Sequence, residues 1–195
     1  MKKVDRDGYG TKYLHLQEIT CIVPVVLEGD VISDRFVVGK LAGKGSMGAV
    51  YQAHDRATGK PVAIKVLAEH DADALRRFDH EIHVLSELAH PHIVQHVAHG
   101  VTKKGTPYLV MEWLEGQSLA ARLQEQRLTP KDALELATHI ASALAAAHAR
   151  GIVHRDIKPS NVFLVNHSVH AARVLDFGVA QAPISDSRVT RTGGV

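Results

Sequence analysis

The hydrophobic pattern of the chain is strand-like in its first part and helical in its second. Apolar runs too short for helices recur at residues 36–38, 49–51, 61–67, 93–97 and 108–113. The run at 61–67 begins with a proline, which a strand tolerates where a ladder donor can be spared. Between residues 71 and 90, apolar side chains recur at steps of three and four, which predicts a helix with one apolar face.

Helix signals dominate the second part of the chain. Ser118 can cap a short helix, and Thr129 followed by Pro130 predicts the start of a longer one that ends before Gly151. The predicted apolar face of this helix consists of Leu134, Ala137, Ile140, Ala141 and Leu144. Two short strands are expected at residues 162–165 and 173–175. Strands first and helices second predict an α+β fold with two lobes.

Composition narrows the class of protein only slightly. The 195 residues are 45% hydrophobic and 23% charged, a balance typical of a globular domain. A net charge of +2, without a basic run, gives no reason to expect a nucleic-acid partner. The single Cys21 rules out an internal disulfide framework, and no apolar stretch reaches the roughly 18 residues of a membrane span. We therefore expect a cytoplasmic protein with no membrane segment in this chain.

A glycine-rich segment lies between the first two predicted strands, at residues 43–50 (GKGSMGAV). Glycines let a backbone turn tightly and approach phosphate oxygens. An ordinary glycine-rich hairpin would have the same pattern. A dinucleotide-binding fingerprint would need a helix directly afterwards, whereas residues 49–53 have strand character.

Lys65 lies inside the apolar run at 61–67, where a charge is costly unless a negative group meets it. Glu81 lies on the apolar side of the predicted helix, beside Phe78 and Leu85. An inward lysine and an inward carboxylate are natural partners. Taken singly, each residue would more often point to solvent.

Two further motifs follow in the second part. Residues 154–161 (HRDIKPSN) contain five fixed letters that coincide by chance about once in 3 million positions if each residue type is used at roughly 5%. Residues 176–178 (DFG) follow shortly afterwards. An isolated DFG is usually a turn, but here it completes an ordered set of motifs.

This ordered set resembles the protein-kinase signature, in the form found in bacterial serine/threonine kinases of the eukaryotic-like class. The resemblance runs from about residue 29 to residue 195. It implies an N-terminal extension at 1–28 and a kinase domain at 29–195. Within that domain it implies a complete N-lobe (about 29–112) made of an antiparallel sheet and one helix, a hinge (112–116), and only the first part of a helical C-lobe (117–195).

The resemblance implies ATP and Mg²⁺ as cofactors. Asp156, Lys158 and Lys65 would be catalytic, and Asn161 and Asp176 would hold Mg²⁺. The residues implied for nucleotide binding are Leu41, Gly43, Gly45, Gly48, Val50, Ala63, Lys65, Glu81, Met111, Glu112 and Leu114.

The implied partners are ATP and proteins that present a serine or threonine hydroxyl, because Lys158 after Asp156 is the serine/threonine pattern. Thr190 and Thr192 are candidate phosphorylation sites, where a phosphate could pair with Arg155, and dimerisation would allow autophosphorylation. The family's Gly-Thr-Pro and Ala-Pro-Glu segments do not occur in this sequence. We therefore expect a fragment with weak ATP binding and little activity.

Two other functions remain open. One is a non-catalytic nucleotide-binding or scaffold module, although Lys65, Asp156, Asn161 and Asp176 are all intact. The other is a small-molecule phosphotransferase of related fold, which the Lys158-Pro159 continuation disfavours.

Overall fold

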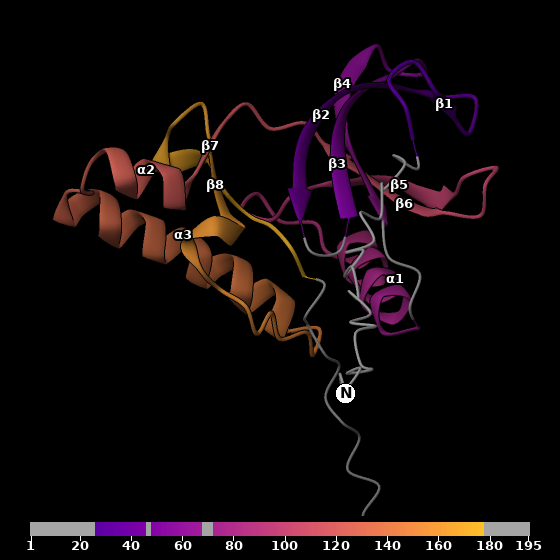
Figure 1. The fold of residues 1–195 in the computed structure, drawn as a ribbon. Helices are drawn as coiled ribbons and strands as arrows, with labels where there is room; N and C mark the ends of the chain where they lie inside the picture. The colour runs from indigo at the N-terminus through magenta and orange to yellow at the C-terminus, as the bar shows by residue number, and fades with distance from the viewer. Residues whose placement is uncertain (1–25, 46–47, 68–71, 178–195) are drawn as a thin grey trace, which may run out of the picture.

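The computed structural model describes residues 26–45, 48–67 and 72–177. Within these ranges, six strands form one sheet that carries a helix, and three shorter strands form a second sheet beside two further helices. In Figure 1 the large sheet and helix α1 lie on one side of the molecule, and helices α2 and α3 lie on the other. This arrangement confirms the predicted α+β fold with two lobes.

The large sheet has the order β1-β2-β3-β4-β6-β5, and all its pairs are antiparallel. The bounds of its strands are β1 Val31–Ile32, β2 Phe36–Gly45, β3 Gly48–Asp55, β4 Lys60–Leu67, β5 His96–Val101 and β6 Pro107–Glu112. The β2–β3 ladder extends to the pair Gly45 and Gly48, so these two glycines lie at the end of this hairpin.

Strand β4 is buried on both faces, and its alternation decides where Lys65 points. Val62, Ile64 and Val66 join the apolar core on one side of the sheet. Because successive side chains of a strand point to opposite faces, Ala63 and Lys65 lie on the other side. That second face carries α1, so the lysine is directed toward the helix.

Helix α1 spans Ala72–Glu87 and packs its apolar stripe into a core that both lobes share. Phe78, Ile82 and Leu85 are buried, as their spacing predicts. The same core contains Ala143 of α3 and Phe177. Helix α1 therefore shares its core with Phe177 of the DFG motif.

The second part of the chain contains α2 (Leu119–Glu125), α3 (Pro130–His148) and the small sheet of β7 (Gly116–Ser118), β8 (Val162–Val165) and β9 (Ala172–Val174). Single turns of 3-10 helix, η1 (Pro159–Asn161) and η2 (Val169–Ala171), lie on either side of β8. The side chains of Ser118 and Thr129 accept hydrogen bonds from Ala121 N and Asp132 N, which confirms both predicted N-caps.

Two expectations differ from the structure. The strand expected at 93–97 begins at His96, because Ile93 instead bridges Val174 of the small sheet. In α3 the buried side is Leu136, Ala143 and Ala147 rather than the predicted face, and Leu134 is 72% exposed. This helix is apolar on most of its circumference, so periodicity did not select the buried side.

A membrane-spanning helix, one both long and apolar enough to cross a bilayer, does not occur among the described residues.

Candidate active site

Lys65 is the centre of an ion-pair network on the inner face of the large sheet. Its Nζ donates to both carboxylate oxygens of Glu81, each at 2.8 Å, and to Oδ1 of Asp176 at 2.6 Å. Burial alone would lower the pKa of Lys65, but the two carboxylates outweigh it and raise that pKa. The ammonium group is therefore charged at neutral pH.

The two carboxylates differ in their surroundings. Glu81 is 1% exposed, and burial raises its pKa against the attraction of Lys65. For Asp176, burial would raise the pKa, but Lys65 lowers it below its usual range. Its side chain is 52% exposed. Of the two carboxylates that bind Lys65, Asp176 is therefore the one that a ligand can reach.

Asp156 belongs to a second network on the segment that precedes β8. Its Oδ2 accepts from Lys158 Nζ at 2.7 Å and from Asn161 Nδ2 at 3.1 Å. The bond from Lys158 is the main reason that the pKa of Asp156 is lowered. The carboxylate is therefore ionised at neutral pH and is held in place by two donors.

His154 joins this segment to Asp176. Its Nδ1 accepts from the Asp156 backbone N–H at 3.3 Å, so its Nε2 carries the hydrogen and donates to the Leu175 carbonyl at 2.8 Å. The Leu175 N–H donates to the Asn161 carbonyl at 2.9 Å, and the Phe177 ring packs 4.6 Å from the His154 ring. These contacts fix the position from which Asp176 extends.

A cavity of about 480 Å³ lies between the sheet and the residues that follow the hinge. All the residues predicted for nucleotide binding line it except Leu41, which is 47% exposed, and its neighbour Ala42 takes that place. Asp176 also lines the cavity, whereas Asp156, Lys158 and Asn161 belong to the adjoining network.

Sequence reasoning missed six residues that line this cavity: Ala42, Val94, Trp113, Gly116, Phe163 and Leu175. For four of them a signal was present, and two of these, Trp113 and Gly116, lie within the predicted hinge (112–116). Phe163 follows Asn161 by two residues on an apolar strand, and Leu175 directly precedes Asp176. The candidate phosphorylation sites Thr190 and Thr192, and Gly178 of the DFG motif, lie outside the described residues.

Two of the three glycines of the loop, Gly48 and Gly43, differ in their surroundings. At Gly48 a Cβ atom would lie 2.0 Å from the Val66 carbonyl oxygen, so the β3–β4 contact requires glycine there. At Gly43 a Cβ would meet no atom within 4 Å. The fold therefore explains Gly48, whereas Gly43 leaves open backbone on the side of the cavity, which suits the close approach of a ligand.

The donor set fits a hard divalent cation. Lys65 balances only one of its two carboxylate partners, which leaves excess negative charge at Asp176. Asn161 uses its amide nitrogen to hold Asp156, which leaves its amide oxygen for a cation. Carboxylate and amide oxygens are the ligands that Mg²⁺ accepts in phosphate-binding sites.

A charged lysine, two acids and a glycine hairpin lie around one cavity on a two-lobed fold, which is the combination that the sequence analysis expects of a protein kinase. Comparison with known proteins gives the same class: the model of the protein kinase domain matches residues 36–194. The chain belongs to the protein kinase family.

Relatives of bacterial origin are named as serine/threonine kinases. The chain is 39% identical over 173 residues to a probable serine/threonine-protein kinase PknB of Lactococcus lactis, a match that covers 84% of this chain and 26% of that protein. It is 39% identical over 174 residues to PrkC of Bacillus subtilis, covering 87% and 26%. It is 37% identical over 173 residues to PknB of Mycobacterium tuberculosis, a match that covers 84% of this chain and 27% of that protein. The chain thus spans about a quarter of the length of these relatives.

Proposed function

We propose that the protein is a serine/threonine protein kinase, which transfers the γ-phosphoryl group of ATP to a protein hydroxyl. The observation that carries the proposal is the position of Lys65, which is bound to Glu81 and Asp176 at the edge of the cavity. Next to it, Asp156 is held by Lys158 and Asn161. The names of the relatives support the same activity.

ATP is proposed to lie in the cavity with its base against the hinge and its phosphates under the glycine hairpin. Val50 and Ala63 would cover the base, and Met111 would close the rear of the cavity. Lys65 would exchange its contact with Asp176 for phosphate oxygens, while Glu81 keeps it in place. Asp176 and Asn161 are the residues that would hold Mg²⁺, and the ion would supply positive charge against the phosphate charge that develops during transfer.

In the proposed reaction the substrate hydroxyl oxygen bonds to the γ-phosphorus, and the bond from that phosphorus to the β–γ bridging oxygen breaks. The hydroxyl proton passes to the Asp156 carboxylate, and ADP leaves. Lys158 would stabilise charge on the transferred group. Positioning and electrostatics carry such a reaction, and no covalent nucleophile is needed.

Two further parts of the proposal concern the location of the protein in the cell and the activity of the 195-residue chain. A cytoplasmic location agrees with the use of ATP and with a single cysteine. Low activity of the 195-residue chain taken by itself agrees with the exposed apolar side of α3, where Leu134 is 72% exposed. Rates of transfer are therefore best measured on the complete product of the gene that encodes this chain.

Nucleotide binding can be followed with Trp113, the one tryptophan of the sequence, which lines the cavity. We expect saturable quenching of its fluorescence by ATP in the presence of Mg²⁺, with a Kd in the upper part of the about 1 μM–1 mM range usual for enzyme substrates. Asp176→Asn should keep ATP binding but lose most of the tightening that Mg²⁺ gives. Absence of any saturable change in the unmodified protein would contradict the proposed function.

A further inference from the structure

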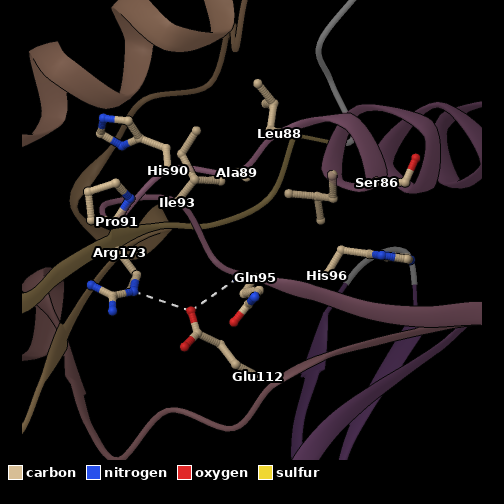
Figure 2. A pocket seen from close by; sticks show the side chains of 11 residues that line it. Ser86, Leu88, Ala89, His90, Pro91, Ile93, Gln95, His96, Glu112 and Arg173 are labelled. Atoms are coloured by element: carbon tan, nitrogen blue, oxygen red, sulfur yellow. Dashed lines mark hydrogen bonds and ion pairs between the residues drawn. The ribbon is translucent and has the colours of Figure 1, made fainter.

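A second cavity, of about 340 Å³, lies behind the hinge and is called the rear cavity below. It is lined by Leu85, Ser86, Leu88, Ala89, His90, Pro91, Ile93, Gln95, His96, Glu112 and Arg173. Figure 2 shows Arg173 and Gln95 approaching Glu112 from two different segments. Within the described part of the chain, Glu112 is the residue common to the linings of both cavities.

Glu112 binds the connector between α1 and β5 (residues 88–95) through its backbone and its side chain. Its N–H donates to the Gln95 carbonyl at 2.9 Å, and its Oε1 accepts from the Gln95 N–H at 3.0 Å. The same Oε1 accepts from Arg173 Nε at 3.2 Å. One carboxylate oxygen thus joins the first residue of the hinge to the connector and to strand β9.

Strand β9 leads directly to the active-site acid. Leu175, two residues after Arg173, lines the nucleotide cavity, and Asp176 follows it and contacts Lys65. Val174, which follows Arg173 in β9, makes two backbone hydrogen bonds to the connector. Its N–H donates to the His92 carbonyl at 2.8 Å, and its carbonyl accepts from the Val94 N–H at 3.1 Å. Arg173 adds a direct contact from this strand to the hinge.

The ion pair between Arg173 and Glu112 is mostly buried. The side chains of Arg173 and Glu112 are 23% and 26% exposed, so water screens them less than it screens a surface pair. Among the residues that line the rear cavity, Glu112 is the one acid and Arg173 the one arginine or lysine. Without Arg173 the carboxylate would keep the Gln95 N–H and turn toward water for its remaining bonds, which would shift the hinge backbone attached to it.

We propose that Arg173 is a positioning residue for ATP. By binding Glu112 from the rear cavity, it holds the hinge at a fixed distance from strand β9, which leads into Leu175 and Asp176. The base and phosphate ends of ATP are then received by two groups whose spacing is set before the nucleotide arrives. This inference rests on the proposed function, because it assigns the hinge to the base and Asp176 to the phosphates.

The test is a double-mutant cycle read by the Kd for ATP in the presence of Mg²⁺, measured by Trp113 fluorescence in the protein. We expect Arg173→Ala to raise the Kd about 5-fold, at the lower end of couplings typical between two sites. Glu112→Gln should have an effect of similar size, and the double variant should be no worse than Arg173→Ala. Arg173→Lys, which keeps the cation, should recover most of the affinity.

Arg76→Ala is the matched control, because it removes an arginine from an ion pair with Asp73 in which both side chains are more than 70% exposed. Its Kd should equal that of the unmodified protein. All titrations are made below the melting temperature of every variant, so that a loss of stability does not enter the Kd. If the unmodified protein binds ATP and the two single effects add, or if Arg173→Ala has no effect, Arg173 has no positioning role. If the unmodified protein does not bind ATP, the proposed function fails together with this inference.

Discussion

Replacing Asp156 by asparagine is expected to lower phosphate transfer by about 1,000-fold while ATP binding stays nearly unchanged. The substitution keeps the size of the side chain but removes the carboxylate that we propose as the acceptor of the hydroxyl proton. General-base groups contribute about 100–10,000-fold to a rate. The hydrogen bond from Lys158 lowers the pKa of Asp156, so the carboxylate is ionised at neutral pH. The measurement is the initial rate of transfer to a serine- or threonine-containing peptide by the complete gene product.

Asp79→Asn is the control for this prediction, since Asp79 is an exposed acid on α1 outside the described networks. Its rate should match that of the unmodified enzyme. A rate for Asp156→Asn within a few-fold of the unmodified enzyme would show that Asp156 is not the residue that positions or deprotonates the hydroxyl.

Replacing Lys65 by methionine is expected to destabilise the fold by about 3–5 kcal/mol at pH 8 and to prevent transfer. The substitution leaves Glu81, which is 1% exposed, without its cation and close to Asp176. Breaking a buried ion pair by removal of one partner costs about this much, because a buried charge is left uncompensated. The quantity to measure is the free energy of unfolding in urea at a series of pH values.

The pH dependence of this loss has a definite sign. Burial already raises the pKa of Glu81 in the unmodified protein, and without Lys65 it should rise further above its unfolded value of about 4.3. The native variant then holds more protons than the unfolded chain above that pH, so its stability falls as the pH rises from 5 to 8. Lys65→Met with Glu81→Gln should be more stable than Lys65→Met at pH 8 and should lose the pH dependence, but should remain inactive. If Lys65→Met alone is equally stable at pH 5 and pH 8, the proposed interaction between Lys65 and Glu81 is contradicted.

The sequence predicted well those contacts that depend on local periodicity. The apolar run that contains Lys65 and the helical spacing around Glu81 indicated that these two residues could pair, and the structure brings them together. The caps at Ser118 and Thr129 are equally local, since each depends on a polar side chain before a short apolar run. The ordered motifs predicted the family, which the family model and the relatives confirm.

Features that depend on contacts between residues far apart in the sequence were harder to predict. Ile93 has strand character in sequence, but it pairs with Val174 through an isolated bridge, which no local pattern indicates. In α3, alanines occupy several faces, so the side that packs on the small sheet depends on what lies opposite. The contact between Glu112 and Arg173 joins residues 61 positions apart and has no local signature. The assigned roles of the site residues and the domain limits stay predictions.

The measurement that tests the central claim most directly is transfer from γ-labelled ATP by the complete gene product, followed by identification of the labelled amino acid. A mixed peptide substrate with serine, threonine and tyrosine should yield labelled phosphoserine or phosphothreonine and no phosphotyrosine, because Lys158 after Asp156 is the serine/threonine pattern. The label should depend on Mg²⁺ and disappear in Asp156→Asn. ATP binding without labelled serine or threonine would contradict the account and favour a non-catalytic nucleotide-binding module.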